Sequence, residues 1–330
     1  MKEILMAVDS GKNSTKALCQ YNGKRYSTIF RTKVQEAKNV DIDLNSDSFN
    51  VHFQGKSYLV GNVVSEDKVS YSITKNTIDH RIAIFTAISH LLKKVKIPQS
   101  SNIQLAVNFP ISLFKDRLLK DMFKHELLNN GELVLINVND QLYSFRITKV
   151  MVINESIGPI YSRIGEFRRK DSLVIDVGSL NVSFCSYNGV QYDLNSMVSL
   201  DKGISTLQNK IAEKLTEKFG TYVTSDDALR IMNNGFLSIR GEKQEKSVEI
   251  IQSLTQEHVQ DIFNQAIGKG ISFNNRDIIF IGGGSIILES LLQKEFPLAT
   301  FEINPQFSNC ESFLTIIGAV HEKETTTNID

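Results

Sequence analysis

The chain of 330 residues has few cysteines, no surplus of charge of either sign and no long apolar run. Its three cysteines, Cys19, Cys185 and Cys310, are far apart, which excludes a disulfide framework and a cysteine metal site. Lysine plus arginine number 37, as do aspartate plus glutamate, so no domain-wide basic field is available to bind nucleic acid directly. No apolar run approaches the ~18 residues that a membrane span needs. We therefore expect a cytoplasmic protein without a membrane segment.

The strongest positive signal is an internal repeat. Residues 4–11 (ILMAVDSG) are echoed by residues 173–179 (LVIDVGS), and each copy is an apolar strand that ends in Asp-x-Gly. After each copy comes a second apolar stretch and then the turn Tyr-Asn-Gly, at 21–23 and at 187–189. Asn-Gly between strands predicts a type I′ hairpin, because both residues tolerate the positive φ that this turn needs.

Each predicted hairpin carries an aspartate at its first bend, Asp9 in the first copy and Asp176 in the second. A glycine follows two residues later, Gly11 or Gly178, and lets backbone N–H groups converge on an anion. The neighbouring carboxylate can hold a hydrated cation. Two such bends predict a site for a metal-bound polyphosphate.

The first bend does not belong to a Walker loop. That motif needs glycine five residues before Gly11, where Met6 stands. It also needs serine or threonine directly after Lys12, where Asn13 stands. We therefore reject a P-loop.

A second glycine-rich segment follows a buried strand over 277–281. Gly282, Gly283, Gly284 and Ser285 lead from that strand into a helix, a junction that brings the backbone close to a ligand. Ile287 stands where the last glycine of a Rossmann fingerprint belongs, so this is not that motif. A tight strand-to-helix turn is the structural alternative.

Acidic residues and histidines add one further candidate. Residues 152–159 predict the start of a helix at the seam between the halves, where Glu155 is a candidate for orienting or deprotonating a water, or only complements the helix dipole. Residues 225–227 (SDD) are interpreted as a structural helix cap. The six histidines show no metal-ligand spacing and are interpreted as bystanders.

The other periodic segments predict alternating strands and helices, and hence mixed sheets covered by helices. They are a strand-rich insertion over 31–70, a helix that starts after Thr77, a strand over 103–109, helices over 113–128, 205–219, 246–267 and 286–296, and a polar tail.

Together these motifs resemble the actin, sugar kinase and Hsp70 ATPase superfamily, and more specifically its ParM/StbA branch of bacterial plasmid-segregation actins. The resemblance covers nearly the whole chain, and it implies an α/β fold, the actin-like ATPase fold of two duplicated ribonuclease H-like domains around a nucleotide cleft. Domain I would span 1–152 with a small inserted subdomain over about 31–70. Domain II would span 153–330, with a helical outer subdomain over about 203–270, a last helix over about 311–322 that packs back toward domain I, and a disordered tail over 323–330.

The resemblance also implies roles for individual residues. Asp9 and Asp176 would hold Mg²⁺ through water, and Glu155 would position the attacking water. The residues that would bind the nucleotide, ATP or GTP, are Gly11, Lys12, Asn13, Lys16, Gly178, Ser179, Leu180, Gly203, Glu213, Lys214, Gly282, Gly283, Gly284 and Ser285. Lys12 stands where a small hydroxyl residue is common in the family.

The function that the resemblance implies is a nucleotide-dependent ATPase that forms filaments and segregates plasmid DNA. The chain would assemble head to tail into a homopolymer of one or several strands, and a DNA-binding adaptor of the ParR type would connect it to the plasmid. One alternative is a small-molecule (sugar) kinase of the same superfamily, with Asn108 and Asp116 as candidate sugar-binding residues. Another is a nucleotide-binding cytoskeletal scaffold that does not hydrolyse its nucleotide.

Overall fold

The computed structural model describes residues 3–37, 44, 47–65, 74–97 and 99–327. By its internal contacts the chain divides into two compact units. The first unit comprises Met1–Ile164 together with Phe307–Asp330, and the second comprises Gly165–Gln306. None of the helices within the described ranges is long and apolar enough to cross a membrane.

The first unit is built on one nine-stranded sheet of order β3-β2-β1-β7-β9-β8-β5-β6-β4. Its first three strands are antiparallel, and β7 and β9 then continue parallel to β1. The bounds are β1 Glu3–Ser10, β2 Ser14–Tyr21, β3 Lys24–Arg31, β4 Val34–Glu36, β5 Ser48–Phe53, β6 Lys56–Gly61, β7 Ser101–Phe109, β8 Val134–Val138 and β9 Gln141–Asn154.

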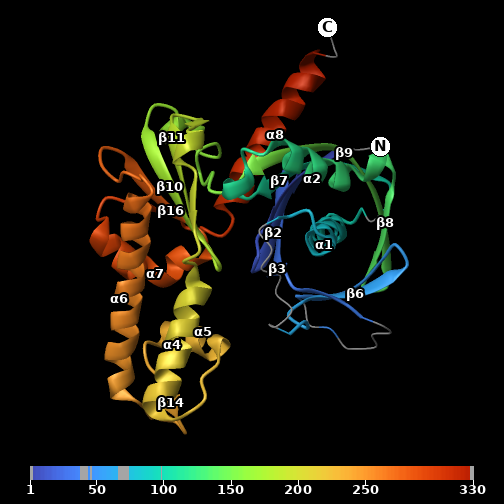
Figure 1. The fold of residues 1–330 in the computed structure, drawn as a ribbon. Coiled ribbons are helices and arrows are strands. Elements are labelled where there is room, and N and C mark those ends of the chain that lie inside the picture. The colour runs from blue at the N-terminus through green and yellow to red at the C-terminus, as the bar shows by residue number, and fades with distance from the viewer. Residues whose placement is uncertain (1–2, 38–43, 45–46, 66–73, 98, 328–330) are drawn as a thin grey trace. The chain divides into compact units, whose positions relative to one another are not determined.

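The predicted insertion over 31–70 supplies β4, β5 and β6, which join the main sheet because β5 pairs with β8. Residues 38–43, 45–46 and 66–70 of that insertion lie outside the described residues. The sheet curls around helix α1 (Ile78–Lys94), which Figure 1 shows nearly end-on. Helix α1 is apolar on most of its surface, and eleven of its residues are buried. Thr77 caps it as predicted, because its side chain accepts from the N–H of His80.

Helices α2 (Arg117–Leu128) and α8 (Ser308–Thr327) complete the first unit. Helix α2 begins later than the predicted residue 113, because Ile111–Leu113 forms a short 3₁₀ turn and Asp116 then caps the helix. Helix α8 packs on β1, β2 and β7. The Ser312 hydroxyl at its start accepts from the N–H groups of Tyr161 and Ser162 and donates to Gly158 O.

The prediction of a disordered tail over 323–330 is wrong as far as Thr327, because α8 continues through that segment. Glu324 forms an ion pair with Lys149 of β9. Thr325, Thr326 and Thr327 donate their hydroxyls to carbonyls three or four residues earlier, so these polar side chains are satisfied within the helix. Residues 328–330 lie outside the described residues.

The sheet of the second unit repeats the arrangement of β3, β2, β1, β7 and β9, which are the first five strands in the spatial order of the first sheet. Its order is β12-β11-β10-β16-β17, with antiparallel β10, β11 and β12 followed by parallel β16 and β17, and β13 pairs with β11. When the five strands of each set are numbered in chain order, both sets have the spatial order 3-2-1-4-5. This repetition agrees with the internal repeat of the sequence. The bounds are β10 Asp171–Val177, β11 Val182–Asn188, β12 Gln191–Tyr192, β13 Val198–Leu200, β16 Asp277–Ile281 and β17 Thr300–Phe301.

The two predicted Asn-Gly turns differ in detail. In the first, Asn22 and Gly23 form the two-residue loop with φ of 50° and 76°, the signs that a type I′ turn requires. In the second, Asn188 stays in the ladder opposite Gln191, so the loop shifts by one residue to Gly189 and Val190. Gly189 alone has a positive φ, 58°, and its N–H donates to Lys170 O, which holds the shifted register.

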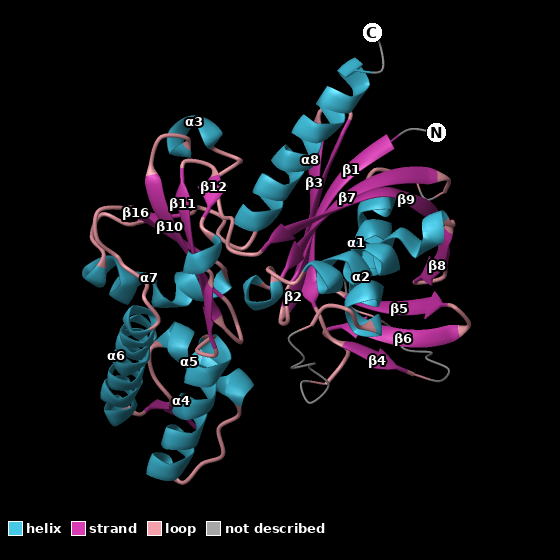
Figure 2. Ribbon diagram, turned by 45° about the horizontal axis from the view of Figure 1, so that its top comes forward, coloured by secondary structure: helices cyan, strands magenta, loops and turns pink. Residues whose placement is uncertain are grey.

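Helices cover the second sheet and extend into a separate helical portion, which Figure 2 shows around α4, α5 and α6. The second unit's core includes a cluster of phenylalanine rings in edge or tilted contact, Phe263, Phe273, Phe280 and Phe296. The bounds are α3 Ile164–Phe167, α4 Ile204–Phe219, α5 Ser225–Asn234, α6 Glu245–Gly268 and α7 Gly283–Glu295, with a short hairpin of β14 Ser238–Ile239 and β15 Glu242–Lys243. The predicted acidic cap of α5 is present, with Thr224 as the capping residue.

Candidate nucleotide site

The two acidic bends have the same local geometry. Gly11 N donates to Ser14 O at 3.1 Å in the first, and Gly178 N donates to Asn181 O at 2.9 Å in the second. A Cβ on either glycine would lie 3.0 or 2.8 Å from that same carbonyl oxygen, so a side chain there would crowd the turn. Asp9 and Asp176 each stand two residues before their glycine, at matched positions of matched hairpins.

In the first bend the register separates two groups of side chains. Asp9 lies opposite Lys16, while the neighbouring pair, Ser10 and Thr15, projects from the other face of the sheet. Lys16 Nζ lies 3.9 Å from Asp9 Oδ2, and only 6% of Asp9 is exposed. The buried Cys310 thiol of α8 donates to Lys16 O, which places α8 against this pair.

On the other face, a chain of hydrogen bonds links the bend to α1. Ser10 Oγ lies 2.9 Å from His80 Nδ1 and 3.3 Å from Thr15 Oγ1, which in turn lies 2.8 Å from Thr32 Oγ1. The N–H of Ser10 donates to Asn108 Oδ1 at the end of β7. The first bend is therefore anchored to α1, to the end of β7 and to Thr32, which follows β3.

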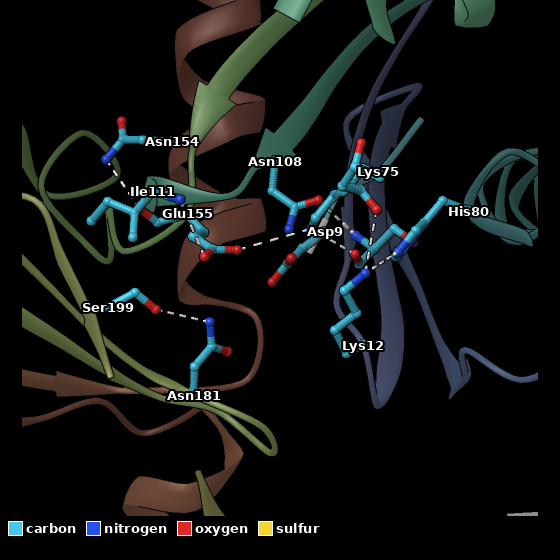
Figure 3. A network of polar contacts seen from close by, with 12 residues as sticks. Asp9, Lys12, Lys75, His80, Asn108, Ile111, Asn154, Glu155, Asn181 and Ser199 are labelled. Carbon is cyan, nitrogen blue, oxygen red and sulfur yellow. Dashed lines mark hydrogen bonds and ion pairs between the residues drawn. The ribbon is translucent and has the colours of Figure 1, made fainter. Parts of the chain in front are cut away.

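Lys12 does not extend into solvent. Its Nζ donates to Thr74 O at 3.4 Å and lies 3.1 Å from His80 Nε2 (Figure 3). Burial, followed by the nearby Lys75 charge, lowers the pKa of Lys12 to about 8. The interpretation of the histidines as bystanders is wrong for His80, which is 2% exposed and holds both Lys12 and Ser10.

Lys75 is a site residue that the sequence analysis missed. Its side chain is 2% exposed, its Nζ donates to Ser10 O at 2.7 Å, and it lies 3.9 Å from Glu155 Oε2. It therefore places a buried positive charge between the first bend and the candidate water-orienting carboxylate. A single lysine two residues before a helix cap has no distinguishing pattern, so only the tertiary structure reveals it.

Glu155 does not begin a helix, so that prediction is wrong. Strand β9 continues to Asn154, and Ser156 with φ of 66° ends the extended run. The N–H of Glu155 donates to Phe109 O, and Glu155 Oε1 accepts from Ile111 N at 3.3 Å. Complementation of a helix dipole therefore does not explain this carboxylate, which is held at the ends of β7 and β9.

The second bend is shaped by helix α4. The carbonyl oxygens of Gly178, Ser179 and Leu180 accept from the first N–H groups of α4 and its cap, those of Ile204, Ser205 and Gly203. In a planar trans peptide the N–H points opposite to the preceding carbonyl. The N–H groups of Ser179, Leu180 and Asn181 therefore point away from α4, an arrangement that can bind an anion.

Gly203 allows this close contact between the second bend and α4. A Cβ at Gly203 would lie 2.2 Å from Ser179 O, so no other residue fits without moving the backbone. The hydroxyls of Ser179 and Ser205 lie 2.7 Å apart, and Asn181 Nδ2 donates to Ser199 Oγ. This contact brings the bend residues Gly178, Ser179 and Leu180 together with Gly203, the cap of α4.

The glycine-rich junction packs on Asp176. Gly282 has φ of 84°, and a Cβ there would lie 2.3 Å from Asp176 Oδ1. A Cβ on Gly284 would lie 2.6 Å from the Val177 side chain. Helix α7 starts at Gly283, three residues earlier than predicted, and the Ser285 hydroxyl donates to Gly282 O within the turn.

Glu213 and Lys214 lie further along α4, on its exposed surface. Lys214 forms an ion pair with Glu217 at 2.8 Å and, with Glu249 and Glu257 of α6, lines a surface groove. Within the described part of the chain, no hydrogen bond or ion pair connects either side chain with the second bend.

No cluster of three or more His, Cys, Asp or Glu side chains that could hold a metal directly occurs in the described part of the chain. The two candidate sugar-binding residues have structural contacts, because Asn108 accepts from Ser10 N and Asp116 caps α2. Asn108 Oδ1 is thus used to anchor the first bend, and Asp116 Oδ1 is used to cap a helix.

Residues 7–158, which include the whole first bend and Glu155, match the family model of the N-terminal domain of actin-like proteins. That part of the chain is therefore similar to the N-terminal domain of actin-like proteins, and solved structures show the actin-like fold for the chain as a whole. The resemblance to ParM-type actin-like proteins, stated from the sequence, is confirmed at the level of the fold. No curated protein matches the sequence.

Three similar structures define the fold. The archaeal actin homologue Ta0583 in complex with ADP is 18% identical, with a TM-score of 0.73 over 97% of this chain and 99% of that one. The Alp12 filament subunit is 24% identical, with a TM-score of 0.72 over 97% and 100%. A 15-stranded ParM filament from Clostridium botulinum is 18% identical, with a TM-score of 0.75 over 97% and 100%.

Proposed function

We propose that this protein is a cytoplasmic ATPase that assembles into filaments and segregates plasmid DNA through a DNA-bound adaptor of the ParR type. The observation that carries the proposal is the pair of matched acidic bends, each with an aspartate two residues before a glycine whose N–H closes the turn. Identical turns at the same place in two copies of one topology favour a shared role in phosphate binding over two unrelated loops.

The residues present fit a magnesium-nucleotide. Carboxylate oxygens are ligands that Mg²⁺ prefers, and the metal usually keeps several waters, so Asp9 and Asp176 would hold it through water. Bound Mg²⁺ would neutralise phosphate charge. Lys16 and the backbone N–H of Asn13 would bind phosphate from the first bend, while Gly11, whose N–H closes the turn, would keep the bend free of a side chain. Ser179 and Leu180 would bind it from the second bend through N–H groups turned away from α4, while Gly178, whose N–H closes the turn, would leave room for the phosphate.

For the nucleoside we propose Gly282, Gly283 and Gly284, with Glu213 and Lys214 as the less supported members. At the glycine junction the backbone comes close to Asp176, because no side chain intervenes. The ADP complex of an archaeal actin homologue supports nucleotide binding by the same fold. ATP and GTP are both candidates. The domain boundaries predicted from the sequence stay proposals, as does a last helix that packs toward domain I.

Hydrolysis needs a positioned water and charge neutralisation, without a covalent nucleophile. Glu155 would orient the attacking water, because its Oε1 is fixed by Ile111 N while its second oxygen lies beside Lys75. Lys75 would keep Glu155 oriented and supply positive charge near the phosphates.

Filament formation is supported by two of the similar structures, which are filaments of Alp12 and of ParM. Head-to-tail contacts do not close, and this symmetry yields open polymers. A connection to DNA through an adaptor agrees with the formal net charge of zero, which offers no field for direct DNA binding.

The test is light scattering and phosphate release after addition of Mg²⁺ with ATP or GTP. We expect scattering above a threshold protein concentration, followed by phosphate release. In Glu155→Gln, whose amide oxygen can still accept from Ile111 N, release should fall by about 100-fold or more while filaments form and last longer. Glu132→Gln, an exposed carboxylate of the same unit, is the matched control.

The alternatives give different results in the same experiment. A scaffold would assemble with no phosphate release from the start, and a sugar kinase would release ADP only when a sugar is added. Scattering that ignores nucleotide altogether would contradict the proposal.

A further inference from the structure

Lys12 is the residue of the first bend whose position is least expected. A lysine at a loop tip usually extends into water, where its ammonium is best solvated. Here the side chain folds back beside α1, and its Nζ contacts Thr74 O and His80 Nε2 (Figure 3). The ammonium therefore exchanges water for one carbonyl at 3.4 Å and one ring nitrogen at 3.1 Å.

His80 is fixed in a way that determines what it can offer Lys12. Its Nδ1 lies 2.9 Å from Ser10 Oγ, and the ring is 2% exposed, so it cannot turn to solvent. A charged ammonium has only donors, so Nε2 must be the acceptor and Nδ1 must carry the ring proton. If His80 were also protonated, two donors would face each other across 3.1 Å. When Lys12 is charged, only one proton therefore lies between Nζ and Nε2, and Lys12 donates it to the ring nitrogen.

The charges that face Lys12 come from three elements. Lys75, from the segment before α1, opposes its positive charge, while Asp79 of α1 and Glu155 after β9 favour it. Glu155 lies 3.9 Å from Lys75 and is shared with it. Burial, with the charges of Lys75 and Lys12, also keeps the pKa of His80 well below its usual range. The ammonium groups of Lys12 and Lys75 thus share the negative charge of Glu155.

We propose that Lys12 and His80 form a proton-accepting pair at the first bend, which takes up a proton when a polyphosphate binds there. This inference rests on the proposed nucleotide site and concerns its linkage to pH. A bound polyphosphate supplies the negative charge that the pair lacks, so the ammonium form of Lys12 becomes the stable one. His80 acts as a positioning residue because it holds the acceptor side of the contact.

The pKa of Lys12 is about 8 in the free protein. A bound polyphosphate would raise it, and this difference sets the sign of the linkage. Below pH 8 the lysine is already protonated, so binding takes up little. As the pH rises through 8, each binding event must take up more of a proton. Nucleotide affinity should therefore be constant below about pH 7 and fall as the pH rises above 8.

The experiment is calorimetric titration of the full chain with Mg-ADP in buffers of different ionisation enthalpy. The slope of heat against buffer enthalpy counts the protons taken up. We expect about half a proton at pH 8 and close to one at pH 9, from a pKa of about 8. ADP is used because it separates binding from hydrolysis.

Three variants assign the proton. Lys12→Arg should bind Mg-ADP without proton uptake, because a guanidinium stays charged. Lys12→Met should also show no uptake and should bind about tenfold or more weakly at pH 7. His80→Gln should reduce the proton uptake, because a glutamine amide would hold the Lys12 side chain less firmly in its buried position than the fixed imidazole does. Lys124→Met, an exposed lysine of α2, is the matched control and should behave as the unmodified chain.

The outcomes separate the inference from the function on which it rests. If Mg-ADP binds with no proton uptake at pH 8 to 9, or if Lys12→Arg takes up as much as the unmodified chain, the inference is overturned and nucleotide binding stands. If neither Mg-ADP nor Mg-GDP produces any binding heat, the proposed function itself fails.

Discussion

Gly282 is a residue of the second unit that has no room for a side chain and also a backbone conformation that favours glycine. Its φ of 84° is a conformation that side chains rarely adopt, and the point where a Cβ would stand is 2.3 Å from Asp176 Oδ1. The absence of a side chain at 282 therefore allows the carboxylate of Asp176 to lie where it does. The glycine-rich junction and the acidic bend act as one packed feature, although they are far apart in the sequence.

This contact predicts a separable effect of Gly282→Ala. We expect a loss of about 1–3 kcal/mol in the free energy of unfolding from the strained backbone, and a displaced Asp176 that weakens Mg-nucleotide binding further. Urea denaturation and nucleotide titration measure the two effects. Gly268→Ala in α6, where a Cβ meets nothing within 4 Å, should leave the protein as stable or slightly more stable. Equal behaviour of the two variants would contradict the argument.

At the scale of one element, helix α5 shows how local sequence controls a helix start. The Thr224 side chain accepts from Asp227 N, and the Asp227 carboxylate accepts from both the N–H and the hydroxyl of Thr224. Those hydrogen bonds, with that from Arg230, lower the pKa of Asp227 to about 2. The cap is one residue before the Ser225 suggested by the sequence, because Asp227 then occupies the third helical position of a capping box.

The cap predicts the cost of removing it. Thr224→Ala should lower the free energy of unfolding by about 1 kcal/mol, because an orphan N–H of the first turn loses its acceptor. The same change should bring the pKa of Asp227 back toward its usual range. Urea denaturation followed by circular dichroism, and carboxyl titration by NMR, measure these effects. Asp226→Asn, beside the box but outside it, should cost less, and an equal loss would show that the dipole and not the cap dominates.

At the scale of the whole molecule, stability is linked to acid through histidines in both units. Burial is the main cause that lowers the pKa of His90 and of His258, each to about 4, and that holds the pKa of His80 well below its usual range. Groups whose folded pKa is depressed bind more protons in the unfolded chain. Stability should therefore fall as the pH drops from about 6.5 through 4.

Thermal unfolding at several pH values tests this linkage. We expect the midpoint to fall steadily between pH 6.5 and 4.5, and His90→Gln or His258→Gln should make that fall less steep. His125→Gln, an exposed histidine of α2, should leave the pH dependence as it was. If the buried-histidine variants keep the full slope, the acid sensitivity arises elsewhere.

What the sequence alone determined was the local chemistry and its repetition. Asp-x-Gly after an apolar strand needs only neighbouring residues to define it, so the two bends, their hairpins and the alternation of strands and helices could be predicted. The start of α1 at Thr77 and the strand Asp277–Ile281 were likewise predicted correctly. These features depend on propensities and hydrogen bonds within a few residues.

Only the tertiary structure decided which distant side chains meet those bends. Lys75 and His80 carry no motif, yet a buried position beside Ser10 gives both a role. Glu155 is a candidate from its place at the seam, but the residues just before it, predicted to start a helix, form the end of strand β9, because the pairing of β9 with β7 is a long-range contact. Burial and charge neighbours depend on which strands lie side by side, and this information is not contained in any short stretch of the chain.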